Sequence, residues 1–235
     1  MGFSHLPTYR EQADSMIPGR PDAIVFDCDG TLMDTHACVR HALDEVFQRR
    51  GRLCSAEIHE GVVGLSIPAM AVLLTSVLCA DADRLAGELL TAMIDHVPVA
   101  AVPLPGAVEI VTLAASDLPV AIASNSPRPL LNASLTQGGL LELVHVTVAA
   151  DEVRAPKPAP DLYLAACRYL DVAPHRALAI EDSPIGVTAA RAAGLTVLTV
   201  GPRTRGSQAH VDHLDNPILL RRICEISTPE PDLVS

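Results

Sequence analysis

One stretch decides the fold of this 235-residue chain: Ala23-Ile24-Val25-Phe26-Asp27-Cys28-Asp29-Gly30-Thr31-Leu32. Its first four residues are apolar without alternation, which is typical of a parallel strand covered by helices on both faces. Two carboxylates follow at once, those of Asp27 and Asp29, and Gly30 then allows a tight turn. The stretch therefore predicts a buried strand over residues 23–27 that ends in a polar site.

Further runs of the same kind alternate with helical patterns along the chain. The predicted strands are Pro119–Ser124, His145–Ala150, Ala177–Glu181 and Thr196–Val200. The helical patterns between and around them are Ala107–Ala115, Arg128–Gln137, Asp161–Leu170 and Pro184–Ala193. Strands that alternate with helices indicate an α/β fold, a doubly wound, Rossmann-like parallel sheet.

The interval between the first two strands is too long for a single crossover. It contains three helical patterns and then a group of prolines: His36–Arg50, Ile67–Cys79, Ala82–His96, Pro98, Pro103 and Pro105. We therefore expect a small inserted α-helical cap domain over residues 35–103. The α/β core domain then comprises residues 21–34 and 104–235 and ends in a short helix around Ile218–Ile226. Residues 1–20 are expected to be a loose leader.

Composition limits the possible partners. The net charge of −11 argues against nucleic acid and against anionic membranes. The apolar runs are shorter than the ~20 residues that span a bilayer, and the six cysteines form no CxxC pair. These features predict a cytoplasmic protein, by default a monomer. An anionic small molecule remains a possible substrate if the site supplies its own positive charge.

The chain contains sixteen arginines and one lysine, Lys157. A lysine retained against this bias indicates a place where a compact ammonium fits and a wide guanidinium does not. Lys157 also lies near the end of a predicted strand, as do the other polar candidates: Asp27, Asp29, Ser124, Asn125, Glu181 and Asp182. Because ligands bind outside the carboxyl ends of such strands, we expect these residues to converge on one site.

Four carboxylates in one place repel each other and require a cation. A hard divalent ion with oxygen ligands meets this need, and Mg²⁺ combines one or two carboxylates with water and phosphate oxygens. Ser124 and Asn125 can donate hydrogen bonds to a phosphate, and Lys157 adds a point charge. The set therefore predicts a Mg²⁺-dependent site for a small phosphorylated metabolite.

These motifs resemble those of the haloacid dehalogenase superfamily, most of whose members are phosphatases. Residues 26–32 are similar to its first motif, and Ser124, Lys157 and the pair Glu181-Asp182 resemble the second, third and fourth in order. The sequences Lys-Pro-Ala-Pro-Asp at 157–161 and Glu-Asp-Ser-Pro-Ile-Gly at 181–186 resemble motifs of the subfamily with a helical cap. That subfamily includes β-phosphoglucomutase and phosphatases of sugar phosphates and phosphoglycolate.

The resemblance implies a role for each matching residue. Asp27 would be the nucleophile that forms an aspartyl-phosphate, and Asp29 would act as general acid and then general base. Asp27, the backbone carbonyl of Asp29 and Asp182 would hold Mg²⁺, with Glu181 acting through water. Lys157 would be catalytic and would contact the substrate, as Ser124 and Asn125 do. The implied activity is the hydrolysis of a phosphate monoester.

Two alternative functions remain within the resemblance. A phosphomutase of the β-phosphoglucomutase type carries a histidine on the first cap helix and a basic cap loop, whereas Val39 and the uncharged residues 63–67 stand at these places here. The second alternative function is that of a catalytically inactive phosphate-binding protein with the same fold. Dehalogenases lack the second carboxylate and phosphonoacetaldehyde hydrolases need a cap lysine, so Asp29 and the lysine-free cap argue against both. The HxxH pair His210 and His213 has no third ligand nearby in the sequence.

Overall fold

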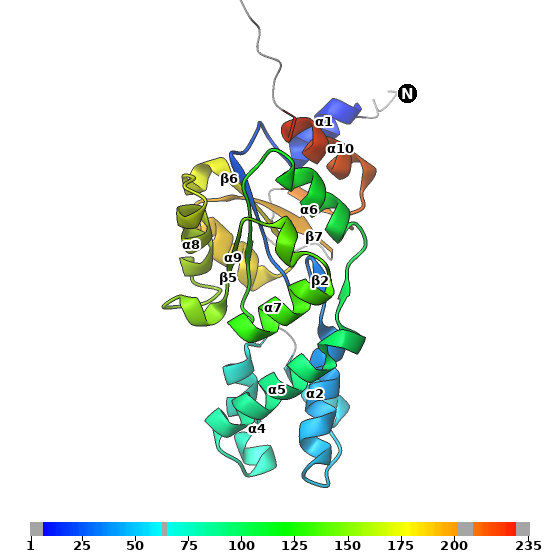
Figure 1. Ribbon diagram of the computed structural model, residues 1–235, viewed down its shortest axis with the longest axis vertical. Coiled ribbons are helices and arrows are strands. Elements are labelled where there is room, and N and C mark those ends of the chain that lie inside the picture. Colours follow the sequence, from blue (N-terminus) through cyan, green and yellow to red (C-terminus); the bar gives the residue numbers. More distant parts are fainter. Residues whose placement is uncertain (1–6, 63–64, 202–208, 229–235) are drawn as a thin grey trace, which may run out of the picture.

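The computed structural model describes residues 7–62, 65–201 and 209–228. With the long axis vertical, a six-stranded sheet lies above a group of helices (Figure 1). The strand order is β5-β4-β1-β6-β7-β8, and all neighbouring strands are parallel. The strands are β1 (Ala23–Phe26), β4 (Val120–Ala123), β5 (Val146–Val148), β6 (Ala177–Glu181), β7 (Thr196–Val200) and β8 (Ala209–Val211). The predicted doubly wound α/β fold is confirmed.

Both faces of the sheet are covered, which explains the uniformly apolar strands. Ile24 and Phe26 of β1 join one buried cluster, whereas Ala23 and Val25 point to the other face, as side chains of a strand alternate. The helices α6 (Ala107–Ala115), α7 (Arg128–Gln137) and α10 (Pro217–Ile226) contribute to the first cluster. The helices α8 (Asp161–Tyr169) and α9 (Pro184–Ala193) contribute to the second.

The face covered by α8 and α9 is rich in alanine. Its buried alanines come from the strands and from both helices: Ala23, Ala121, Ala123, Ala177, Ala179, Ala165, Ala166, Ala189, Ala190 and Ala193. Small side chains on both surfaces allow a helix to approach a sheet closely, and protein interiors are packed about as densely as organic crystals. This face therefore leaves little room for larger side chains.

Within residues 36–100, the described part of the chain forms four helices below the sheet (Figure 1). They are α2 (His36–Gln48), α3 (Ala56–Gly61), α4 (Ile67–Leu78) and α5 (Ala82–Ala100). Here α5 packs against α2 and α4, and it also contacts α7 of the sheet part. The buried side chains of these helices are continuous with one face of the sheet. The division into a core and a cap domain at residues 34/35 and 103/104 stays a prediction.

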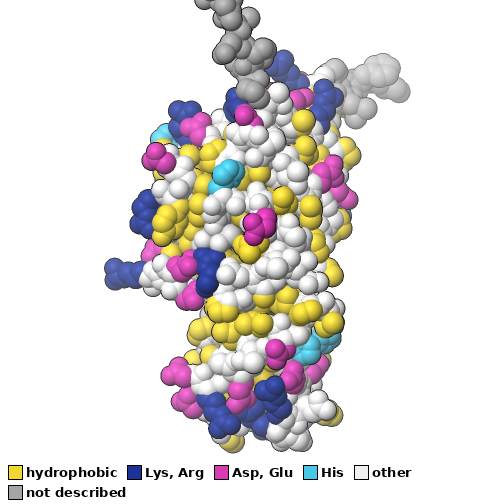
Figure 2. Space-filling model, in the orientation of Figure 1, with side chains coloured by type: hydrophobic (Ala, Val, Ile, Leu, Met, Phe, Trp, Pro, Cys, Tyr) yellow, Lys and Arg dark blue, Asp and Glu magenta, His cyan; other side chains and the backbone are white. Residues whose placement is uncertain are grey.

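Two short strands connect the helical insert to the sheet part. They are β2 (Met33–Asp34) and β3 (Val102–Pro103), which pair antiparallel. The Leu104 N–H also donates to the Leu32 carbonyl at 2.9 Å. The chain therefore leaves and re-enters the sheet part through adjacent segments. Figure 2 shows hydrophobic side chains gathered on one face near the level of this junction.

The expected loose leader is wrong for residues 9–16. They form α1 (Tyr9–Met16), whose capping box joins Thr8 and Glu11. Arg222 of α10 donates to the carbonyls of Ile17 and Gly19, so the turn after α1 is fixed to the last helix. This segment is ordered because it contacts α10, and a contact so distant in sequence cannot be predicted from a local pattern.

Several smaller elements were also absent from the sequence-based prediction. They are β2, β3, β8, α3 and three short 3₁₀ turns at Leu141–Leu143, Ala150–Glu152 and Pro174–Arg176. The predicted terminal helix around Ile218–Ile226 corresponds to α10. Among the described helices, none has the length and apolar character that crossing a membrane requires.

The alanine-rich face generates a prediction about stability. Ala179→Leu should lower the free energy of unfolding by about 1–3 kcal/mol, because Ala179 is fully buried between β6 and its covering helices. Ala56→Leu, at an exposed position of α3, should change it by less than about 0.5 kcal/mol. Urea denaturation of both variants measures the difference. Equal stability of the two variants would contradict close packing on this face.

Candidate active site

The carboxyl ends of β1, β4 and β6 lie side by side, because β4 and β6 are the two neighbours of β1. The chain crosses from β1 to β4 on one side and later to β6 on the other, so the strand order reverses at β1. Ligands bind outside the strand ends at such reversals. The predicted residues end or follow these strands, and Lys157 follows β5: Asp27, Asp29, Ser124, Asn125, Lys157, Glu181 and Asp182.

Asp27 comes directly after β1 and is only 6% exposed. Its N–H donates to the Ile180 carbonyl of β6, which prolongs the strand pairing. Its Oδ1 accepts a hydrogen bond from Lys157 Nζ at 2.5 Å, whereas Oδ2 is buried without a hydrogen-bond partner among the described residues. Burial, followed by the Glu181 carboxylate, raises the pKa of Asp27 well above its usual range. A buried oxygen in this state requires a proton or a cation.

Lys157 lies between two carboxylates. Its Nζ is 2.5 Å from Asp27 Oδ1 and 2.6 Å from Glu181 Oε1, and its side chain is 2% exposed. Burial alone lowers the pKa of this ammonium, but the carboxylates of Asp27 and Glu181 outweigh burial and raise the pKa well above its usual value. Lys157 therefore remains charged and neutralises part of the negative charge around it.

Asn125 fixes the backbone that carries Lys157. Its Oδ1 accepts from the Lys157 N–H at 2.8 Å, and its Nδ2 donates to the Lys157 carbonyl at 3.1 Å. These two bonds attach the lysine segment to the end of β4. The predicted contact of Asn125 with a phosphate stays a prediction, and the structure adds this positioning role.

Glu181 is fully buried at the end of β6. Its Oε1 accepts from Lys157 Nζ and, at 2.9 Å, from the Tyr163 hydroxyl of α8. Its Oε2 accepts from the N–H and the hydroxyl of Ser183, at 3.1 and 3.0 Å. With both oxygens bonded to protein donors, Glu181 holds the ammonium of Lys157 in place. Its predicted water-mediated link to a metal stays a prediction.

Gly186 makes the position of Glu181 possible. A Cβ atom at Gly186, in the first turn of α9, would lie 1.6 Å from Glu181 Oε1. The same turn is capped by Ser183, whose hydroxyl accepts from the Gly186 N–H at 3.1 Å. Helix α9 therefore begins directly against the buried carboxylate, and any side chain at this position would displace that carboxylate.

Three hydroxyl groups orient Asp29. Thr35 donates to its Oδ1 at 2.9 Å, and Ser124 and Ser126 donate to its Oδ2 at 2.8 and 2.9 Å. These donors come from the start of the helical insert and from the end of β4. The Ser124 hydroxyl, predicted to bind phosphate, thus donates to a carboxylate in this structure, since an ionised carboxylate is a strong acceptor. Its contact with substrate stays a prediction.

Asp182 lies against the turn at Gly30. Gly30 has φ +91°, and a Cβ atom there would lie 2.3 Å from Asp182 Oδ2. The Thr31 hydroxyl donates to Asp182 Oδ1 at 3.3 Å. Burial and the adjacent Glu181 carboxylate raise the pKa of Asp182 to about 6. Glycine at position 30 thus serves both the turn and the close approach of this carboxylate.

The acidic residues fit a divalent cation. Asp27, Glu181 and Asp182 each offer a carboxylate oxygen, and these three atoms lie within 4.8 Å of one another. Asp27 Oδ2 is buried without a hydrogen-bond partner in the described part of the chain, and the pKa values of Asp27 and Asp182 are raised. Both observations indicate an excess of negative charge. Oxygen-only donors of this kind suit Mg²⁺.

The residues of the site to which the sequence-based prediction gave no role include Tyr163, Ser126 and Thr35. Tyr163 is one of only three tyrosines and lies fully buried on α8, where its contact with Glu181 depends on the crossing of that helix. Ser126 stands two residues after Ser124, and this spacing was a usable signal. No sequence signal marks Thr35, because the turn at Gly30 is what brings this residue back beside Asp29.

Two other predictions concern residues outside this site. His210 interacts with Thr199 and Asp212, and among the described residues neither His210 nor His213 belongs to a group of three potential metal ligands. Of the predicted cap loop, residues 63 and 64 lie outside the described residues. Leu65 and Ser66 are half-buried.

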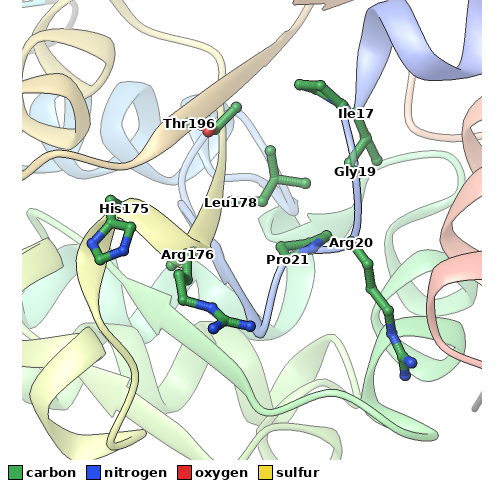
Figure 3. Close-up of a pocket in the computed structure, with 10 residues that line it drawn as sticks. Ile17, Gly19, Arg20, Pro21, His175, Arg176, Leu178 and Thr196 are labelled. Carbon is green, nitrogen blue, oxygen red and sulfur yellow. The ribbon is translucent and has the colours of Figure 1, made fainter.

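A pocket of about 180 Å³ lies at the amino ends of the strands, opposite to the candidate active site (Figure 3). It is lined by residues at or before the amino ends of β1, β6 and β7, among them Pro21, Leu178 and Thr196. Its arginines are ion-paired, Arg176 with Asp22 and Arg20 with Asp117. None of the predicted site residues lines this pocket, so it is separate from the candidate active site.

Comparison with known proteins agrees with the geometry. A family model described as a haloacid dehalogenase-like hydrolase matches residues 21–194. The chain is 32% identical to validoxylamine A 7'-phosphate phosphatase of Streptomyces hygroscopicus subsp. limoneus, over 87% of this chain and 95% of that protein. It is 31% identical to fructose-1-phosphate phosphatase YqaB of Escherichia coli, over 75% of this chain and 95% of the relative.

Solved structures share the fold. The crystal structure of CbbY from Rhodobacter sphaeroides in complex with phosphate superposes with a TM-score of 0.74. The match covers 83% of this chain and 96% of that chain at 24% sequence identity. This likeness supports the fold alone, whereas the two relatives named above are phosphatases.

The buried charge cluster predicts the effect of removing its cation. Lys157→Met should lower the free energy of unfolding by about 3–5 kcal/mol, because Asp27 and Glu181 would stay buried without their counter-charge. Adding Glu181→Gln should restore part of the loss, since one carboxylate fewer remains uncompensated. Urea denaturation compares both variants with Arg168→Met, an exposed control on α8. A Lys157→Met variant as stable as the control would contradict the role given to this ammonium.

Proposed function

The chain belongs to the haloacid dehalogenase-like hydrolase family, and we propose that it is a Mg²⁺-dependent phosphatase of small organic phosphate monoesters with Asp27 as its nucleophile. The observation that carries the proposal is the state of Asp27. This carboxylate lies at the strand-order reversal with one oxygen fixed by Lys157, and its other oxygen is buried without a hydrogen-bond partner among the described residues. Such a carboxylate is oriented and desolvated for attack on phosphorus.

The proposed reaction has two steps. An oxygen of Asp27 first bonds to phosphorus while the bond from phosphorus to the leaving oxygen breaks, and the leaving oxygen takes a proton from Asp29. Water then attacks the aspartyl-phosphate, gives a proton to Asp29, and the bond between phosphorus and Asp27 breaks. Splitting the displacement in this way replaces one difficult step with two easier ones. The products are the free alcohol and phosphate.

The surroundings of Asp29 suit this alternation between acid and base. Thr35, Ser124 and Ser126 hold its carboxylate in one orientation. To reach the leaving oxygen, Asp29 exchanges at least one of these bonds for a bond to substrate. If the exchanged bond is that of Ser124 or Ser126, the released hydroxyl is available as a donor to the phosphate. The predicted role of Ser124 in substrate binding is compatible with this exchange.

Mg²⁺ would be held by Asp27, Asp182 and the backbone carbonyl of Asp29, with Glu181 acting through water. When bound, it supplies positive charge that stabilises the phosphoryl oxygens. Lys157 adds a positive charge at Asp27 Oδ1. The support for this set is its chemistry, since oxygens of the three acidic side chains lie within 4.8 Å of one another and suit a hard cation.

The proposed substrate class is a phosphorylated sugar or similar polyhydroxylated molecule. The support comes from the two phosphatases, whose names give a sugar phosphate and the 7'-phosphate of validoxylamine A as what they act on. Among relatives of the mutase type, β-phosphoglucomutase carries a histidine where Val39 stands here. Val39 is half-buried against the hydrophobic core and has no ionisable group. This position supports hydrolysis over mutase chemistry.

Asp27→Asn should lower kcat by at least ~10³-fold, because an amide does not attack phosphorus. The fold should persist, since asparagine still accepts from Lys157 through its Oδ1. Phosphate release from fructose 1-phosphate, β-glucose 1-phosphate and an aryl phosphate measures the effect. Asp95→Asn, an exposed control on α5, should retain wild-type rates.

Three results would overturn parts of the proposal. Near-normal turnover by Asp27→Asn would exclude this residue as nucleophile. Glucose 6-phosphate that forms from β-glucose 1-phosphate faster than free phosphate would make the chain a mutase. Phosphate binding without any turnover by the wild type would identify a binding protein.

Removal of the metal gives a second test. Chelation should abolish phosphate release and Mg²⁺ should restore it, whereas Ca²⁺ should inhibit because it prefers more ligands and a looser geometry. Asp182→Asn should raise the Mg²⁺ concentration for half-maximal activity by at least ~10-fold. Asp95→Asn again serves as the control. Full activity after exhaustive chelation, or an unchanged Mg²⁺ requirement in Asp182→Asn, would contradict the metal site.

A further inference from the structure

A second group of potential metal ligands lies in the helical insert, apart from the candidate active site. Asp44 belongs to α2, Cys54 to the segment between α2 and α3, and His59 to α3. Each offers one ligand atom, and the three atoms all lie within 4.8 Å of one another. The group therefore brings together a carboxylate, a thiol and an imidazole from three successive parts of the insert.

The geometry is close to that of a coordination site. His59 Nε2 lies 2.9 Å from Asp44 Oδ1, and the His59 side chain is 22% exposed. Cys54 is half-buried beside them. Zinc bonds of about 2.0–2.3 Å imply ligand atoms about 3–4 Å apart around a tetrahedral ion. The three atoms lie within 4.8 Å of one another, slightly wider than such spacings, so the side chains would have to close on the ion.

The donor set identifies the class of metal. Mg²⁺ and Ca²⁺ take oxygen ligands, whereas sulfur, nitrogen and oxygen together suit Zn²⁺. We propose that Asp44, Cys54 and His59 bind Zn²⁺, with water as the fourth ligand, and thereby fix α3 against α2. On binding, the Cys54 thiol releases its proton to solvent and the thiolate sulfur bonds to the ion. This proposal is independent of the phosphatase function.

A nucleophilic Cys-His-Asp arrangement is a competing interpretation of the same residues. Such a cysteine needs a lowered pKa, because the thiolate is the reactive form. Burial, and secondly the Asp44 carboxylate, instead raise the pKa of Cys54 to about 11. The Cys54 thiol donates to the Ser55 carbonyl at 3.9 Å, and His59 Nε2 interacts with Asp44 Oδ1, so the imidazole is not placed as a base for this thiol. A metal ligand therefore fits Cys54 better than a nucleophile.

The site would strengthen the attachment of α3 to α2. This helix has six residues, Ala56–Gly61, and none of them is fully buried. Helices this short are unstable by themselves. Its observed supports are the Ser55 cap, the partly buried Ile58 and the contact between His59 and Asp44. A zinc ion would join α3 to α2 immediately before the predicted cap loop.

Cobalt provides the direct test, because a thiolate bound to Co²⁺ gives a charge-transfer absorption that carboxylates alone do not give. Metal-free full-length protein titrated with Co²⁺ should develop this absorption, and one equivalent of Zn²⁺ should remove it. Cys54→Ser should lose the absorption and weaken zinc binding by at least ~100-fold. Cys79→Ser and Cys224→Ser, at exposed cysteines, should retain both.

Further variants separate this site from the catalytic one. Asp27→Asn should keep the cobalt absorption, and His59→Gln should weaken zinc binding even if Cys54→Ser does not fold. Zn²⁺ should raise the Tm of the wild type but not that of His59→Gln. Absence of the absorption in the wild type, or its persistence in Cys54→Ser, would overturn the proposal. An equal loss in Cys79→Ser would overturn it as well.

Discussion

The site depends on one ammonium group among buried carboxylates. Lys157 bonds to Asp27 and Glu181 in a place from which water is nearly excluded, and Asp182 adds a further negative charge nearby. The surrounding elements hold Lys157 and Glu181 in position. Asn125 attaches the lysine segment to β4, while α8 and the start of α9 supply the remaining donors to Glu181. One positive charge is too little for these carboxylates, so the cluster needs either protons or a further cation to be balanced.

The strands and the main helices were predictable because their signals are local. An apolar run without alternation, a capping serine or a terminal glycine lies within a few residues of the structure it specifies. The predicted helices over residues 107–115, 128–137 and 184–193 have the same bounds in the structure. The site residues were predictable for a related reason, since each one ends or follows a strand and parallel strands bring those ends together.

The remainder depends on contacts between distant parts of the chain. Helix α1 is stabilised through Arg222, more than two hundred residues away in sequence, and β8 is a strand only because β7 lies beside it. The pairing of β2 with β3 joins segments on either side of the whole helical insert. At the site, the roles of Asn125 and Tyr163 follow from how α8 and the lysine segment cross the sheet. Residue type alone does not contain that information.

Gly186 has a consequence for how variation in this chain is interpreted. Replacing an interior helical glycine with alanine ordinarily stabilises a helix by about 1 kcal/mol. Here the added methyl group would occupy the place of a Glu181 oxygen, so the usual sign is reversed. Alanine scanning locates function by removing atoms, and at this position it would add one. The environment of Lys157 thus depends partly on Gly186, a residue that has no side chain.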